Sequence, residues 1–302
     1  MSRLFQAYVI VDWSAASKPS TGKDSVWIGV VRRDARFRPF FEAFNPPTRA
    51  QAEIKLREVL SDLARRSERA LVGFDFALGY PAGTAARLKL KSPPWAGLWT
   101  FMAANVVDKA DNTNNRFAVA AKMNRLMTDE ARPFWGSPPK DAQRWLATTK
   151  PDTHGADLPP AFRRCEIATQ GQGKAGAKTV WQLMGAGSVG GQAIMGMAAL
   201  KRLTDELGDR AAVWPFTTGW RALGPEDVAD KAVVLAEVYP SLHNAKPEPG
   251  EVPDRAQVRA TAEYFAKLDE AGKLGAVFAA PKDAKADIVA QVEQEEGWIL
   301  GV

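Results

Sequence analysis

Two apolar runs in this chain end on aspartate, and they constrain the fold more than any other feature. The runs are Tyr8–Asp12 and Leu71–Asp75. Short apolar runs bounded by turn residues are typical of β-strands, and near-continuous hydrophobicity indicates a strand that is buried on both faces. We therefore expect a sheet covered by helices on both sides, with the two aspartates at the ends of its strands.

The order of the predicted elements places both aspartates at one edge of that sheet. We expect strands over 7–13, 26–32, 39–44, 70–77 and 231–239, an amphipathic helix from Thr48 to about Arg66, and closing helices over 255–272 and 283–296. The three leading strands have short links and would pair antiparallel, whereas the fourth and fifth, reached through helices, would run parallel to the first. The order βββαβ-insertion-βα predicts an α/β fold with a mixed five-stranded sheet. Its aspartates would lie where such sheets bind ligands.

The chain is long enough to bury a large core. It has 302 residues, of which 46% are hydrophobic and 25% are charged, as in ordinary globular proteins. Residues 83–230 are rich in Trp, Pro and Gly, break into short helical pieces and contain no repeat. We expect a single domain over 1–302, with 83–230 as a mostly helical insertion or subdomain between the fourth and fifth strands.

Composition excludes several classes of site. The single cysteine, Cys165, excludes an internal disulfide and a thiolate metal cage, and two histidines leave little for a zinc site. The sequence has no apolar run of membrane-spanning length and no signal-peptide core at its N-terminus, so we expect a cytoplasmic protein without a membrane partner. A net charge of +5 tolerates a polyanionic partner without demanding one. The oligomeric state stays open.

Four aspartates form the candidate metal site. Asp12 and Asp75 would be neighbours, and two like charges held close together need a cation or a shared proton. Asp283 and Asp287 are one helical turn apart, and either could complete the cluster. Mg²⁺ or Mn²⁺ is the expected cofactor, because hard ions take carboxylate oxygens. A pair of ions about 4 Å apart would activate a water for phosphodiester cleavage. Alternatively, strand-terminal aspartates merely begin turns.

Polar residues near these acids are candidates for binding a nucleotide. Ser14 and Lys18 follow Asp12 so closely that they could meet a bound phosphate. Arg116 is one of the cations that accompany the aromatic residues of the insertion, a combination on which nucleic-acid bases stack. The alternatives are a solvated turn for Ser14 and Lys18, and core packing for the aromatic residues.

Two glycine-rich segments resemble phosphate-binding loops only in part. Gly185–Gly190 has the GxGxxG pattern, but the next apolar run is not closed by an acid, so a tight turn that lets a helix pack closely is the favoured interpretation. The segment 171–179 nearly forms a phosphate loop, but no strand precedes it. A flexible basic loop is expected, in which Lys174 and Lys178 could still touch a phosphate.

Short motifs at both ends of the chain resemble a bacterial family of unknown function. They are Val11–Ala16, Phe74–Pro81, Glu237–Pro240 and Glu295–Gly301. That family is assigned to the ribonuclease H-like superfamily, with the Holliday-junction resolvases and the actin-like ATPases, and the resemblance covers about half of the chain. It implies a ribonuclease H-like fold, with Asp12 and Asp75 as metal ligands of the first and fourth strands. Asp283 or Asp287 would stand for the acid of the last helix, and Glu237 for a further ligand or hydrogen-bonding partner.

The predicted function is therefore a metal-dependent phosphodiester hydrolase, nuclease-like, that acts on a nucleic acid or a nucleotide. Its expected catalytic residues are the four aspartates and Glu237. A nucleotide phosphotransferase like the actin-like ATPases is an alternative, but it needs a duplicated core and this chain offers one copy. The other alternative is a non-catalytic module that binds nucleotide or nucleic acid, in which the acids only hold structure.

Overall fold

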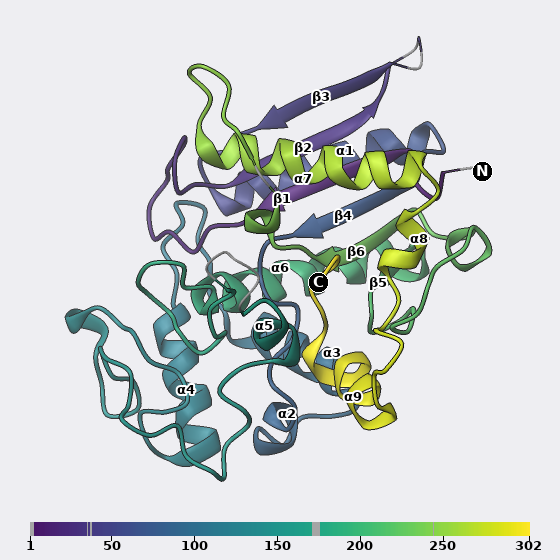
Figure 1. The fold of residues 1–302 in the computed structure, drawn as a ribbon. Coiled ribbons are helices and arrows are strands. Elements are labelled where there is room, and N and C mark those ends of the chain that lie inside the picture. Colours follow the sequence, from purple (N-terminus) through teal and green to yellow (C-terminus); the bar gives the residue numbers. More distant parts are fainter. Residues whose placement is uncertain (1–2, 35, 37, 171–175, 244) are drawn as a thin grey trace.

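A mixed sheet lies at the centre of the protein (Figure 1). The computed structural model describes residues 3–34, 36, 38–170, 176–243 and 245–302. In these residues six strands form the sheet, in the order β3-β2-β1-β4-β6-β5. The strands are β1 (Ala7–Asp12), β2 (Trp27–Arg33), β3 (Pro39–Phe44), β4 (Ala70–Phe74), β5 (Ala211–Val213) and β6 (Val233–Glu237). The predicted α/β class is confirmed.

The pairing of the strands follows the expectation from their connections. β1 pairs antiparallel with β2, and β2 with β3, through short links. β1 and β4 are parallel, as are β4 and β6. The prediction of five strands was wrong by one, because β5 lies inside the predicted insertion and extends the sheet parallel to β6. A strand of three residues is too short to give a clear alternating or apolar pattern.

The helices surround this sheet. They are α1 (Arg49–Arg65), α2 (Thr84–Arg87), α3 (Pro94–Asn105), α4 (Arg116–Thr128), α5 (Arg164–Ala168), α6 (Gly190–Leu207), α7 (Pro253–Glu270), α8 (Leu274–Val277) and α9 (Ala286–Gln291). Thr48 caps α1 as predicted, since its side chain accepts a hydrogen bond from the backbone N–H of Gln51. Within the described ranges, no helix is both long and apolar enough to span a bilayer.

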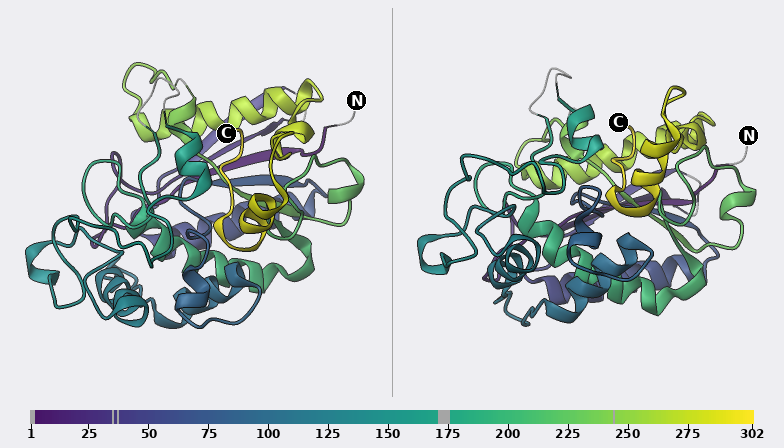
Figure 2. Two further views of the ribbon diagram at one scale, coloured as in Figure 1. Left: turned by 60° about the horizontal axis from the view of Figure 1, so that its bottom comes forward. Right: turned by 90° about the horizontal axis from the view of Figure 1, so that it is seen from below.

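Each face of the sheet packs against its own helices (Figures 1 and 2). Val9 and Val11 of β1 belong to a core shared with α1, α3, α4 and α6, whereas Tyr8 and Ile10 belong to a core shared with α7 and α8. This division follows from the alternation of side chains along a strand. The strands are therefore buried on both faces, as their continuous hydrophobicity predicts.

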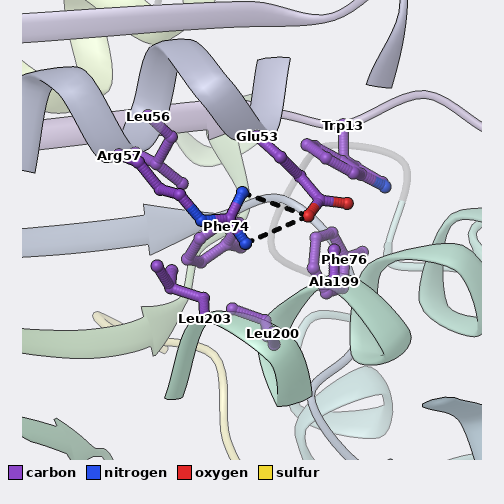
Figure 3. Close-up of a pocket in the computed structure, with 9 residues that line it drawn as sticks. All are labelled: Trp13, Glu53, Leu56, Arg57, Phe74, Phe76, Ala199, Leu200 and Leu203. Atoms are coloured by element: carbon purple, nitrogen blue, oxygen red, sulfur yellow. Dashed lines mark hydrogen bonds and ion pairs between the residues drawn. The ribbon is translucent and has the colours of Figure 1, made fainter. Parts of the chain in front are cut away.

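The contact between α6 and the segment after β4 depends on one glycine. A Cβ atom at Gly196 would lie 2.3 Å from the ring of Phe76, so only glycine lets the helix come this close. This close packing leaves a hollow of about 10 Å³ between α1, β4 and α6, shown in Figure 3. A hollow of that size has room for about one water molecule. It is a packing defect and too small for a ligand.

Candidate functional site

Asp12 and Asp75 lie side by side at the carboxyl end of the sheet. Val11 of β1 pairs with Phe74 of β4, so the residues that follow them, Asp12 and Asp75, are also neighbours. Asp75 Oδ1 accepts a hydrogen bond of 2.7 Å from the backbone N–H of Trp13. The two aspartate side chains also hydrogen-bond to each other. The structure thus brings together the pair that the sequence predicts.

The close approach of these two carboxyl groups changes their protonation. Burial, and then the charge of Asp75, raises the pKa of Asp12 well above its usual range. Burial raises the pKa of Asp75 to about 6, although hydrogen bonds from Asp12 and Trp13 oppose the shift. The pair therefore holds a proton at a pH where isolated aspartates are ionised. A positive ion could take the place of that proton.

The pair lies in an open cleft of about 600 Å³, a size that suits a small organic ligand. Its walls come from the segment after β1, from the segment that leads into α6, and from the first residues of α4 and α7. The polar and charged residues that line it include Ser14, Asp24, Arg116, Lys178, Gln192 and Asp254. The cleft is therefore built from segments that are far apart in the sequence.

The buried side chain of Arg49 holds the segment after β1 in place. Arg49 Nη1 donates to the backbone carbonyls of Ser14 and Ala16 at 3.0 and 2.7 Å. The same guanidinium forms a 2.6 Å ion pair with Asp108. Ser14 lines the cleft as expected, and its hydroxyl oxygen accepts a hydrogen bond from the backbone N–H of Ala16 at 3.1 Å. Lys18 is exposed and is not part of the cleft lining, unlike the prediction.

Arg116 is the second predicted nucleotide-binding residue that lines the cleft. Its Nη1 donates to Ser17 Oγ and Asn114 Oδ1, each at 2.9 Å. No carboxylate oxygen of a described residue lies within ion-pair distance, and its buried Nε has no hydrogen-bond partner there. Burial, and then the charge of Arg49, lowers the pKa of Arg116 to about 10. The group stays cationic at neutral pH, and no described carboxylate forms an ion pair with it.

Asp24 and Asp254 are the other acids of the cleft, and neither Asp283 nor Asp287 lines it. Both predicted residues are exposed, at or just before α9, and outside the cleft lining. Asp254 stands in the first turn of α7, and its Oδ2 accepts a 2.6 Å hydrogen bond from the backbone N–H of Asp24. Burial raises the pKa of Asp254, and its charge raises those of Asp12 and Asp75. The expected four-aspartate cluster is thus replaced by a different set.

This set does not form a ready cage for a metal ion. Across the part of the chain that the structure describes, no three His, Cys, Asp or Glu side chains are grouped closely enough to hold one ion. The pair of Asp12 and Asp75 remains, with Asp254 as a further charge in the same cleft. An ion here would need water or substrate oxygens to complete its coordination.

Glu237 has another role than the one expected for a metal ligand. It is buried at the end of β6, and both carboxylate oxygens accept hydrogen bonds from the buried Arg163, at 2.6 and 2.8 Å. Oε2 also accepts one from the backbone N–H of Leu78 at 3.0 Å. Arg163 binds Glu166 as well, at 2.9 Å, and burial raises the pKa of Glu166 to about 7. Glu237 is the hydrogen-bonding partner that the motif allowed, with its carboxylate fully engaged.

The segments that carry the family resemblance meet in the same network. Arg163 Nη1 donates to the carbonyl of Glu296, and the carboxylate of Glu296 accepts from the backbone N–H of Ala82. A Cβ atom at Gly79 would lie 2.0 Å from the carbonyl oxygen of Glu295, so the two segments touch through their backbones. Gly79, Glu295 and Glu296 therefore fix the segment that follows Asp75 and lie outside the cleft lining, whereas Asp12 and Tyr239 of two other motifs line it.

The glycines of the segment 185–190 let α6 begin close to the cleft. A Cβ atom at Gly190 would lie 2.4 Å from the carbonyl oxygen of Val180, in agreement with the predicted packing role. The same segment also lines the cleft, which the sequence pattern did not reveal. The aliphatic chain of Lys178 runs beside Gly187, with its Cγ 3.4 Å from the ideal Cβ position. Residues 171–175, with Lys174, lie outside the described residues.

Comparison with known proteins gives no further guide to this site. No family, curated protein or solved structure matches the chain. The function must therefore be inferred from the geometry and chemistry of the cleft.

Proposed function

We propose that this protein is a metal-dependent phosphoester hydrolase that acts on a nucleotide or a nucleic acid. One observation carries the proposal. The hydrogen-bonded carboxyl pair of Asp12 and Asp75 lies in a cleft that also contains Arg116, a cation without a carboxylate partner in the described chain. Phosphoryl transfer needs acidic groups that bind a metal ion and a cation that binds the anionic substrate. The cleft has residues of both kinds.

We further propose that the core is ribonuclease H-like. The order β3-β2-β1-β4-β6, with the first three strands antiparallel and the rest parallel, supports this assignment. So do the positions of Asp12 at the end of β1 and of Asp75 directly after β4. In this interpretation β5 and the helical segment before it are additions to that core.

The acid pair fits one Mg²⁺ or Mn²⁺ ion. Two buried carboxyl groups in hydrogen-bond contact cannot both be ionised without a compensating positive charge. Mg²⁺ is commonly held by one or two carboxylates, with waters and substrate phosphates as its other ligands. When bound, such an ion would polarise a phosphoryl oxygen of the substrate and would lower the pKa of a bound water toward neutrality. The described carboxylates do not form a second group of metal ligands. The proposal is therefore for one ion and not for the pair of ions that the sequence suggested.

The other groups of the cleft have roles that follow from their charge. Asp254, whose pKa is raised by burial, is suited to accept the proton of the attacking water. Arg116 is suited to neutralise negative charge on the phosphoryl oxygens, because it is already fixed by Ser17 and Asn114.

A hydrolysis assay on a substrate panel tests the proposal. The panel contains p-nitrophenyl phosphate, bis(p-nitrophenyl) phosphate, nucleotides, and fluorescent oligonucleotides in single-stranded and duplex form, each with Mg²⁺, Mn²⁺ or EDTA. We expect metal-dependent turnover that Asp12→Asn and Asp75→Asn abolish. Asp205→Asn, a change at an exposed residue of α6, is the matched control and should stay active.

Turnover that survives both Asp12→Asn and Asp75→Asn would exclude this site as the catalytic one. Thermal stabilisation by a nucleotide, with no turnover of any substrate, would instead support the non-catalytic binding module.

A further inference from the structure

The cationic side of the cleft is organised around the start of α6. A Cβ atom at Gly191, in the first turn of this helix, would lie 3.3 Å from Arg116 Cδ. Lys178 lies against Gly187, a few residues earlier in the same segment. The two cations therefore flank one short stretch of backbone, and all four residues line the cleft.

In the first turn of α6 the backbone N–H of Gly190 already donates to the carbonyl of Gln182, so among the described residues the N–H groups of Gly191 and Gln192 remain for a ligand. The N-cap of this helix is Val189, which offers no side-chain acceptor to the N–H groups of the turn. Helix N-termini attract anions through these N–H groups and through the helix dipole. The guanidinium of Arg116 lines the same cleft, although its Nε is buried and out of reach of a ligand. An anion with several oxygens would satisfy donors from the helix and from Arg116 together.

The charges of the cleft limit the size of such an anion. Its described lining contains four acids, Asp12, Asp24, Asp75 and Asp254, but only two bases, Arg116 and Lys178. A polynucleotide backbone is bound by cations that follow it from phosphate to phosphate. Here both cations flank one short stretch of backbone, residues 187–191. This distribution fits a single phosphoryl group and disfavours a continuous strand.

We infer that Arg116, Lys178 and the first turn of α6 form a phosphoryl-binding subsite, and that its ligand is a compact phosphate ester of nucleotide size. The cleft of about 600 Å³ has room for such a molecule. The inference rests on the proposed function for the role of this ligand as substrate. Binding of the phosphoryl group itself does not require the metal ion or Asp12.

The test is calorimetric titration of the metal-free protein, in EDTA and at low salt. The probes are inorganic phosphate, a nucleoside monophosphate, and a single-stranded oligonucleotide without terminal phosphates. Arg116→Gln should weaken binding of phosphate and of the monophosphate about tenfold, as expected for lost hydrogen bonds to a charged group. Arg125→Gln, the same change at an exposed residue of the same helix, is the matched control. It should bind like the wild type.

Two further variants keep the test decisive. Lys178→Ala changes an exposed side chain, so it should weaken phosphate binding without affecting the fold. Asp12→Asn should bind phosphate at least as well as the wild type, because Asp12 is not part of the subsite and the substitution adds no negative charge to the cleft. Added salt should weaken binding of the monophosphate, because it screens the attraction between the phosphate and the two cations.

Three results would overturn the inference. They are absence of phosphate binding by the wild type at millimolar concentration, equal losses in Arg116→Gln and Arg125→Gln, and tighter binding of the oligonucleotide than of the monophosphate. Arg116-dependent phosphate binding without any hydrolysis would support the subsite and refute the hydrolase. Metal-dependent hydrolysis that is unaffected by Arg116→Gln and Lys178→Ala would do the reverse.

Discussion

Replacement of Asp12 by asparagine should stabilise this protein at neutral and alkaline pH while removing its proposed activity. Asp12 and Asp75 lie side by side, each half-buried, and burial raises the pKa of Asp75 from 3.8 to about 6. An amide at position 12 can donate a hydrogen bond to Asp75 without adding a second negative charge. The substitution therefore relieves a repulsion that the wild type carries whenever no cation is bound.

The magnitude follows from the shift. Between pH 3.8 and about 6, folded Asp75 retains a proton that the unfolded chain has already released, so the free energy of unfolding falls as pH rises. A shift of about two pKa units corresponds to roughly 3 kcal/mol once the pH is above this interval. Burial causes this shift and persists in the variant, so the gain comes instead from removing the effect of the Asp75 charge on Asp12. We expect a gain of about 1 to 2 kcal/mol at pH 8, the usual size for a single substitution, or roughly 2 to 4 °C in Tm.

The assay is thermal and urea unfolding of both proteins at several pH values between 4 and 8, with EDTA present. The stability difference should be small at pH 4 and should grow as pH rises through 6. Added Mg²⁺ should raise the Tm of the wild type at pH 8 but leave that of Asp12→Asn unchanged. Asp205→Asn should show no pH-dependent gain. A variant that is less stable than the wild type at pH 8, or a difference independent of pH, would refute the reasoning.

Three other substitutions probe the surroundings of the site. Glu237→Gln removes a partner of the buried Arg163 and should destabilise the fold by about 3 to 5 kcal/mol in urea unfolding. Gly196→Ala places a methyl group against the ring of Phe76, and calorimetry should show a loss of about 1 to 3 kcal/mol. Asp254→Asn should lower kcat about 100-fold or more, as for loss of a general base, and should abolish the acidic limb of the pH–rate profile without lowering the Tm.

The sequence predicts the sheet and the acid pair because both depend on local and repeated signals. Apolar runs and short links specify the strands and their directions, and parallel pairing of β1 with β4 then makes Asp12 and Asp75 neighbours. The position of Asp254 cannot be predicted from such local signals. Asp254 reaches the cleft through the place where α7 begins, and the only sequence signal was the Pro253-Asp254 start of a helix soon after a strand end.

Glu237 shows why an acid at a strand end is an ambiguous signal. In sequence it resembles Asp12, since each closes an apolar run. What separates them is Arg163, which lies 74 positions away and neutralises Glu237 in the folded chain. Asp12 meets another carboxylate instead. Residues distant in sequence therefore decide whether an acid is held in an ion pair, as Glu237 is, or stays available to bind a ligand. Composition does not reveal which residues become these partners.

The contact between Arg163 and the carbonyl of Glu296 has a consequence for the order in which the chain is made. These two residues are 133 positions apart, so a ribosome needs on the order of ten seconds to travel from one to the other. During that time the emerging arginine lacks one of the acceptors that later surround it, and the segment after β4 lacks the backbone of Glu295 against which Gly79 packs. The packing around Arg163 and Gly79 therefore cannot be completed before the ribosome has translated Glu295 and Glu296.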